Sequence, residues 1–86
     1  MNFVLSNHAQ AEMQRRGIYL TLVSEVVNNP QQIVPERSGR KAYQSQVDLA
    51  SGKISLLRVI VEDNVNPIVV VTVYITSKII KYWRES

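Results

Sequence analysis

The chain has 86 residues, no cysteine, one histidine and a net charge of +3 at pH 7. This length fits one domain, and the lack of cysteine excludes a disulfide framework and a thiolate metal site. We therefore expect no metal and no cofactor. The apolar runs are too short to span a membrane, so we expect a cytoplasmic protein with no membrane partner. The positive charge favours an anionic partner, of which nucleic acid is the commonest.

The first third of the chain predicts two helices. Residues 3–5 form a short apolar segment, either a brief strand or an anchor. Ser6 or Asn7 can cap a helix over residues 7–16, which ends at Gly17 after a basic last turn. A second helix over residues 20–28 presents an apolar stripe and stops before Pro30.

From residue 32 onward the pattern changes to β. The expected strands cover residues 33–37, 41–49, 54–62 and 68–77, separated by loops at 38–39, 50–53 and 63–67. The basic, aromatic tail over residues 78–86 either packs across the sheet or frays. The sequence thus predicts a single α+β domain over residues 1–86, with two N-terminal helices packed on a four-stranded antiparallel sheet.

Alternation along the last two strands predicts which side chains share a face. Val69, Val71, Val73 and Ile75 should face the helices, as should Leu57, Val59 and Val61. Arg58 then points to the opposite face. If the two strands pair, Arg58 lies beside Thr72 or Tyr74, and Lys41 and Tyr43 of the preceding strand join them.

Two residues, one in a predicted strand and one in a predicted helix, are candidates for a chemical role. Arg58 stands in an apolar strand, where a guanidinium beside hydroxyl groups suits a phosphate. Its alternative role is to cover the sheet with its stem while its charged head stays in water. His8 is the natural general acid or base, because its ordinary pKa lies near neutrality, but it can also merely cap or pack.

Several motifs in order carry a family resemblance. They are HAQAEMQRRGI at residues 8–18, NP at 29–30, RVIVE at 58–62, VTVY at 71–74 and KYW at 81–83. This order resembles a family of small bacterial proteins of unknown function with a His-Ala-x-x-Arg-Met-x-x-Arg-Gly-Ile motif. Such proteins look like the barnase, colicin and RelE-like ribonucleases and toxins.

The resemblance implies a RelE/barnase-like fold and a metal-independent endoribonuclease, acting as a toxin that a cognate antitoxin holds inactive. It implies the catalytic residues His8, Arg16, Arg58, Thr72 and Tyr74. The expected substrate-binding residues are Glu12, Arg15, Lys41, Tyr43, Lys78 and Trp83. Where the family has an arginine, this chain has Glu12. Either Arg15 supplies the missing charge, or Glu12 acts as a base, or activity is weakened.

The expected reaction is attack by the 2′-hydroxyl of RNA on the neighbouring phosphate, so that RNA is cleaved and DNA is not. One rival is an RNA- or DNA-binding module without catalysis. Another is a protein-interaction subunit or homo-oligomer that uses exposed Ile68, Val70 and the aromatic tail.

Overall fold

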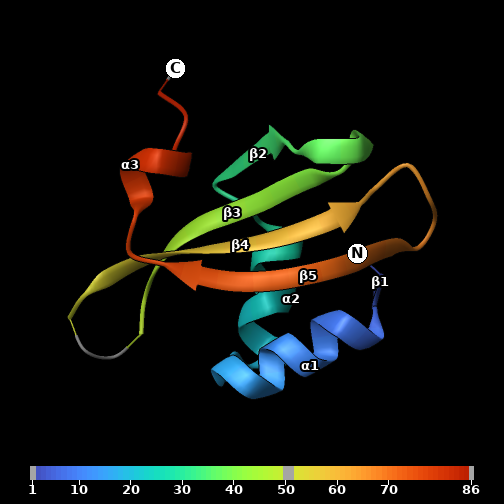
Figure 1. The fold of residues 1–86 in the computed structure, drawn as a ribbon, viewed down its shortest axis with the longest axis horizontal. Coiled ribbons are helices and arrows are strands. Elements are labelled where there is room, and N and C mark those ends of the chain that lie inside the picture. The colour runs from blue at the N-terminus through green and yellow to red at the C-terminus, as the bar shows by residue number, and fades with distance from the viewer. Residues whose placement is uncertain (1, 50–51, 86) are drawn as a thin grey trace.

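In the computed structural model, which describes residues 2–49 and 52–85, two helices cover one face of a five-stranded sheet (Figure 1). The elements in chain order are β1 (Phe3–Leu5), α1 (Asn7–Arg16), α2 (Leu20–Asn28), β2 (Gln32–Pro35), the 3-10 turn η1 (Arg37–Gly39), β3 (Lys41–Asp48), β4 (Ile54–Glu62), β5 (Ile68–Thr76) and the short α3 (Ile79–Tyr82). The strand order is β1-β5-β4-β3-β2. Among the described residues, no helix is long and apolar enough to cross a membrane.

The expected α+β class is confirmed, but the expected sheet of four antiparallel strands is wrong. The segment at residues 3–5 is a fifth strand, and it pairs in parallel with β5. Three residues are too few to show a strand period, so only the pairing identifies this segment as a strand. Both main helices and β4 have the expected bounds, whereas β2, β3 and β5 differ by one or two residues at their ends. Ala50 and Ser51 of the expected loop, and Ser86 of the tail, lie outside the described residues.

Helix α1 is anchored to the sheet at its N-cap residue, Ser6. The Ser6 hydroxyl accepts a hydrogen bond from the Ala9 N–H at 3.0 Å and donates one to the Val71 carbonyl at 2.8 Å. At the other end Gly17 adopts a left-handed conformation with φ of 67°, which suits a residue without Cβ. Of the two caps that the sequence allowed, Ser6 and Asn7, the structure uses Ser6, which also joins α1 to β5.

A β-bulge reverses the alternation of β5. The pairing with β4 shifts between Ile60, which faces Thr72, and Val61, which faces Val70. Val70 is fully buried in the core beneath the helices, and Ile68 packs against the same core. The expectation that Val69 and Val71 share the helix face with Val73 is therefore wrong, because an inserted residue flips the side chains before it. The exposed interaction surface expected at Ile68 and Val70 is wrong for the same reason.

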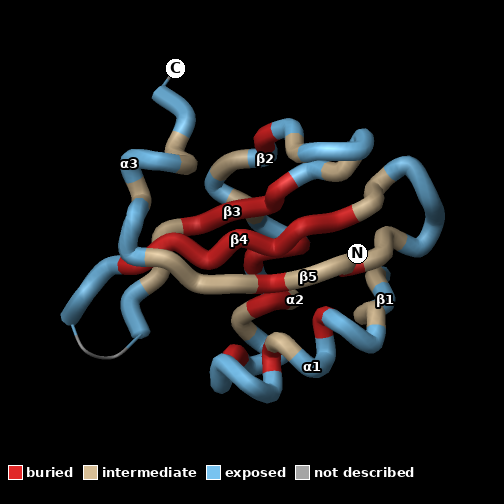
Figure 2. Tube along the Cα trace, viewed as in Figure 1, coloured by how far each residue is buried: buried red, intermediate tan, exposed pale blue. Residues whose placement is uncertain are grey.

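The core lies between the sheet and the two helices, and Figure 2 shows β3 and β4 as the most buried strands. Helix α2 contributes Val23, Val26 and Val27, all at 2% exposure or less. Since valine is a poor helix former, packing on the sheet holds α2 helical. A smaller cluster lies on the other face, on the side of α3 in Figure 1, and comprises Val34, Ala42 and Ile60 with Tyr74 against them.

We predict that Ser6→Ala lowers the free energy of unfolding by about 1–2 kcal/mol, because it removes both the helix cap and the bond to the β5 carbonyl. Urea unfolding followed by circular dichroism measures this change. The control is Thr21→Ala, at an exposed position of α2, and its stability is expected within about 0.5 kcal/mol of that of the unmodified protein. Equal stability of the two variants would contradict the anchoring role of Ser6.

Candidate functional site

The centre of the sheet face opposite α1 and α2 is occupied by a buried arginine. Arg58, in the middle of β4, has only 3% of its side chain exposed. Its Nε donates to Gln44 Oε1 at 2.8 Å, and one Nη donates to Glu36 Oε2 at the same distance. The other Nη donates to the Tyr74 hydroxyl. We name this set, together with Tyr82, the Arg58 cluster.

The Arg58 cluster corrects one part of the sequence analysis. Arg58 does lie beside Tyr74, with Thr72 two residues further along the same face of β5. Its guanidinium, however, is enclosed by the protein and not by water, and each of its three nitrogens donates a hydrogen bond to a protein group, so it does not face a phosphate in solvent. A buried charge needs such partners, since an unpaired ion loses its hydration without compensation.

The tail packs over the Arg58 cluster, one of the two expected outcomes. The Tyr82 ring centroid lies 4.2 Å from the Arg58 guanidinium carbon, a cation–π contact. Gln44 Nε2 donates to the Tyr82 carbonyl at 3.1 Å. Two further bonds join Gln32 of β2 to Arg84: its Oε1 accepts from the Arg84 N–H at 3.1 Å, and its Nε2 donates to the carbonyl at 2.6 Å.

The two tyrosines of the cluster have opposite pKa shifts. Burial raises the pKa of Tyr74, and this outweighs the opposing effect of Arg58. Hydrogen bonding to Lys81, and then to Tyr74, lowers the pKa of Tyr82 below that of an ordinary phenol. Their rings meet edge to face, with centroids 6.2 Å apart. Tyr82 is thus the better proton donor of the two.

Lys41 and Tyr43 do not join this face, so that expectation is wrong. Tyr43 pairs with Val59, whose side chain faces the helices, and its ring is buried in the core there. Its hydroxyl donates to Asp63 Oδ2 at 2.9 Å, and Lys41 pairs with Asp63 at 3.1 Å. Burial and the bond to Asp63 raise the pKa of Tyr43. Both residues therefore hold the β4–β5 loop.

Three residues of the Arg58 cluster were missed from sequence: Gln44, Glu36 and Tyr82. Counting back equally from the expected turn at residues 50–53 places Ser45 opposite Arg58. The observed register places Gln44 there, because β3 ends at Asp48 and the loop is one residue longer than expected. Glu36 precedes η1, and Tyr82 lies in a four-residue helix. Neither position has a periodic signal that would aim its side chain at Arg58.

The structure does not bring His8 to the Arg58 cluster. His8 is exposed on α1, which lies on the opposite side of the sheet (Figure 1). On the same helix, Glu12 is bound by Arg15 at 2.7 Å and by Arg16 at 3.2 Å. The hydrogen bond from Arg15 lowers the pKa of Glu12, with a smaller contribution from Arg16, which makes this carboxylate a weaker base.

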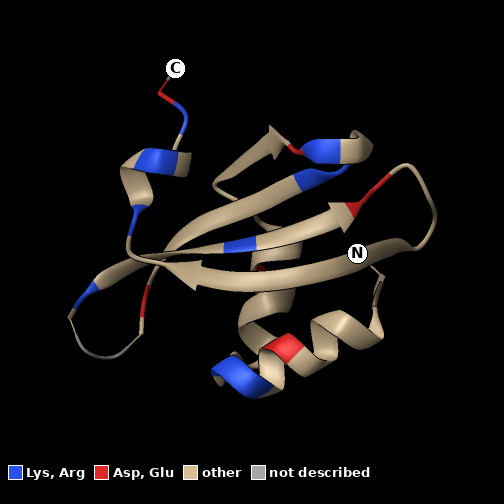
Figure 3. Ribbon diagram, in the orientation of Figure 1, with Lys and Arg blue, Asp and Glu red and all other residues tan. Residues whose placement is uncertain are grey.

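Positive charge is distributed unevenly over the described residues (Figure 3). Five of the ten lysines and arginines form ion pairs: Arg15, Arg16, Arg40, Lys41 and Arg58. Arg37, Lys53, Lys78, Lys81 and Arg84 pair with no described carboxylate. Lys78 and Lys81 line one shallow hollow at α3, and half-buried Trp83 follows them. The tail therefore presents unpaired cations next to an aromatic ring.

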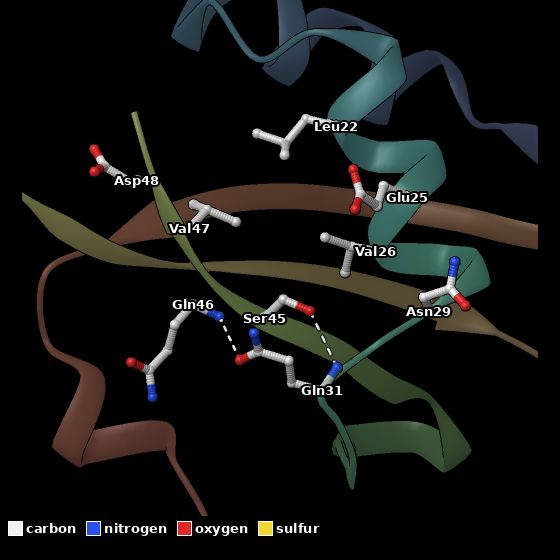
Figure 4. Close-up of a pocket in the computed structure, with 9 residues that line it drawn as sticks. All are labelled: Leu22, Glu25, Val26, Asn29, Gln31, Ser45, Gln46, Val47 and Asp48. Carbon is white, nitrogen blue, oxygen red and sulfur yellow. Dashed lines mark hydrogen bonds between the residues drawn. The ribbon is translucent and has the colours of Figure 1, made fainter. Parts of the chain in front are cut away.

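A separate pocket of about 260 Å³ lies between α2 and β3 (Figure 4). Its wall includes two carboxylates, Glu25 and Asp48, and it contains none of the expected site residues. The Gln31 N–H donates to Ser45 Oγ at 3.1 Å, and Gln31 Oε1 accepts from the Gln46 N–H at 3.0 Å. Carboxylates repel phosphate, so this pocket does not suit an RNA backbone. No described group of acidic or histidine side chains has the arrangement of a metal site.

These features define a small α+β protein with a buried polar cluster and a cationic tail on the sheet face away from its two main helices. The chain belongs to the family described as Domain of unknown function (DUF4258), which matches residues 5–75. The match includes α1, β4 and all of β5 except its last residue, Thr76, and it ends before α3. No curated protein and no solved structure matches the chain significantly.

We predict that Arg58→Ala lowers the free energy of unfolding by about 3–5 kcal/mol, because it leaves the buried polar partners of Arg58 unsatisfied. Urea unfolding measures the loss. Arg37→Ala, which removes an exposed and unpaired cation, is the control and should change stability by less than about 0.5 kcal/mol. A small loss for Arg58→Ala would mean that the cluster does not hold the sheet together.

We predict that Arg15→Ala raises the pKa of Glu12 toward the ordinary glutamate range, because the largest cause of its lowering is removed. Carbon-detected NMR titration of the carboxyl group measures the shift, with Arg37→Ala as the unchanged control. Since the folded pKa is depressed, the stability from Glu12 is present above its unfolded pKa and is lost as pH falls through the folded value. A Glu12 pKa that is the same with and without Arg15 would contradict this assignment.

Proposed function

We propose that this protein is a metal-independent endoribonuclease that acts as the toxin of a toxin–antitoxin system. The observation that carries the proposal is the Arg58 cluster, in which one guanidinium contacts a carboxylate and two phenol rings. The cluster offers a proton acceptor, a proton donor and a positive charge together, next to unpaired cations of the tail. This is the set of groups that RNA cleavage by its own 2′-hydroxyl requires.

In the proposed reaction, Glu36 takes the proton of the 2′-hydroxyl. Its side chain is 29% exposed, so the carboxylate is accessible from solvent while Arg58 fixes its position. The 2′-oxygen forms a bond to phosphorus, the bond from phosphorus to the 5′-oxygen breaks, and the leaving oxygen takes a proton from Tyr82. The products are a 2′,3′-cyclic phosphate and a 5′-hydroxyl; Glu36 has gained one proton and Tyr82 has lost one, so the protons balance.

Tyr82 is preferred to Tyr74 as the acid because its pKa is lowered, whereas burial raises that of Tyr74. Arg58 is enclosed, so its proposed role is to position Glu36 and both phenols. The cations that meet the phosphate directly are then Lys78, Lys81 and Arg84, and Trp83 can stack on an unpaired base.

The proposal departs from the expectation for His8 and Arg16. Both lie on α1, beneath the face of the sheet that lacks the Arg58 cluster. Neither is assigned a step in bond cleavage. Thr72, which shares the face of Tyr74, borders the proposed site without an assigned proton transfer.

A second candidate is an RNA-binding module without catalysis. The observation that favours it is the saturation of Arg58 by protein partners, which is typical of a structural arginine. In that case the tail cations bind RNA and the cluster only holds α3 in place. The two candidates differ in one result, the cleavage of RNA.

We predict that induced expression of the protein arrests growth and fragments RNA. Glu36→Gln should lower the rate of RNA cleavage by about a hundredfold or more, the usual contribution of a positioned base. The amide keeps an oxygen for Arg58, so the fold should persist. Glu62→Gln, a matched change at a carboxylate that pairs with Arg40, should retain activity. Fragment ends are identified as cyclic phosphates by mass spectrometry.

The purified Glu36→Gln variant should still bind a single-stranded RNA that the wild type cleaves. A DNA of the same sequence should stay intact with the wild type and with the variant. RNA binding without cleavage by wild type would overturn the nuclease proposal in favour of the binding module. Loss of cleavage in His8→Ala with activity retained in Glu36→Gln would move the site to α1.

A further inference from the structure

The outer edge of β5 is open along most of its length. β1 pairs only with residues 68–70, whereas β5 continues to Thr76. Over residues 71–76 the sole strand neighbour in the described chain is β4, on the inner side. On the outer side the Ser6 hydroxyl bonds to the Val71 carbonyl, at the very start of this stretch. Alternate N–H and C=O groups along roughly 20 Å of strand are thus left for another partner.

A bulge marks the start of this edge and α1 packs against β5, but the sequence of the edge itself has no residue that prevents pairing. Residues 71–76 read VTVYIT, with no charge, glycine or proline. The opposite edge of the sheet differs, because β2 is four residues long, ends at Pro35 and has its Gln32 side chain bonded to the tail. Natural sheets block exposed edges in such ways, so an unblocked β-branched edge points to a strand that binds there.

Two hollows flank the end of the open edge, one on each face of the sheet. The hollow on the helix side has a volume of about 410 Å³ and is largely apolar; its lining includes Ile18, Leu22, Leu49 and Ile75. Arg16 and Asp48 also line it, so the two signs of charge offset one another there. The hollow on the α3 side is lined by residues 77–81 and contains two lysines and no acid.

An added strand would send alternate side chains to these two faces. Apolar side chains fit the helix side, and acidic side chains fit Lys78 and Lys81, which pair with no described carboxylate. A second copy of this chain does not meet that requirement, because its own residues 68–81 contain no aspartate or glutamate. We infer that the open edge of β5 binds an extended segment of another protein in which apolar and acidic residues alternate.

The inference does not rest on the proposed function, and its test contains no RNA. The probe is a blocked synthetic peptide of alternating valine and glutamate, added to the isotope-labelled full chain. We expect NMR signals of residues 71–76 to shift, and their amides to exchange more slowly with solvent once the peptide is bound. Two N-methylated forms of the peptide, with methyl groups on the valine or on the glutamate amides, act as mutual controls. One form should keep its affinity, and the other should lose it at least tenfold, because a strand pairs through one set of amides.

The charge requirement is tested with Lys78→Glu and Lys81→Glu together. This variant should bind the valine–glutamate peptide roughly three- to tenfold more weakly, and a valine–lysine peptide should restore binding. Arg37→Glu, at an unpaired cation in η1, is the matched control and should bind as wild type does.

Equal binding of both methylated forms would overturn strand pairing in favour of simple charge attraction. A dimeric free chain with residues 71–76 already protected would assign the edge to a second copy.

Discussion

A positive charge enclosed in the middle of β4 is the constraint on which the open face of the sheet depends. A guanidinium without water must have its donors bonded, and here they are bonded by Gln44, Glu36 and Tyr74. Tyr82 covers the plane of the same group. Strands β3 to β5, the segment after β2, and α3 are therefore held by one side chain, and any chemistry on this face depends on it.

The bulge in β5 has consequences at both ends of the strand. On the N-terminal side of the bulge, Ile68 and Val70 face the core, and residues 68–70 pair with β1. At it, the Val71 carbonyl receives the Ser6 hydroxyl, and the chain turns from β1 into α1. Beyond it no described strand pairs with the outer edge of β5. One inserted residue thus determines where the helix docks and where the sheet stays open.

The arrangement of ion pairs determines where the positive charge acts. Cations on α1 and at the β4–β5 end of the sheet have acidic partners within about 3 Å, so their charge is largely compensated locally. The tail cations lack such partners in the described chain. Three of the five cations without a described carboxylate partner, Lys78, Lys81 and Arg84, therefore lie in or next to α3. Both proposed ligands, RNA and an acidic peptide, are anionic, and only the peptide also requires a free strand edge.

The sequence by itself determined the two helices and the positions of four of the five strands, because the helix cap, Gly17, Pro30 and the side-chain periods are local signals. It also placed Arg58 beside Thr72 or Tyr74, and the bulge in β5 makes Tyr74 the partner. Only the tertiary structure decided that Arg58 is buried and that its partners include Glu36 and Tyr82. It alone placed His8 on the other side of the sheet and inserted the bulge. The side chains that bond to Arg58 come from 14 to 22 positions away along the chain, and no local period encodes that proximity.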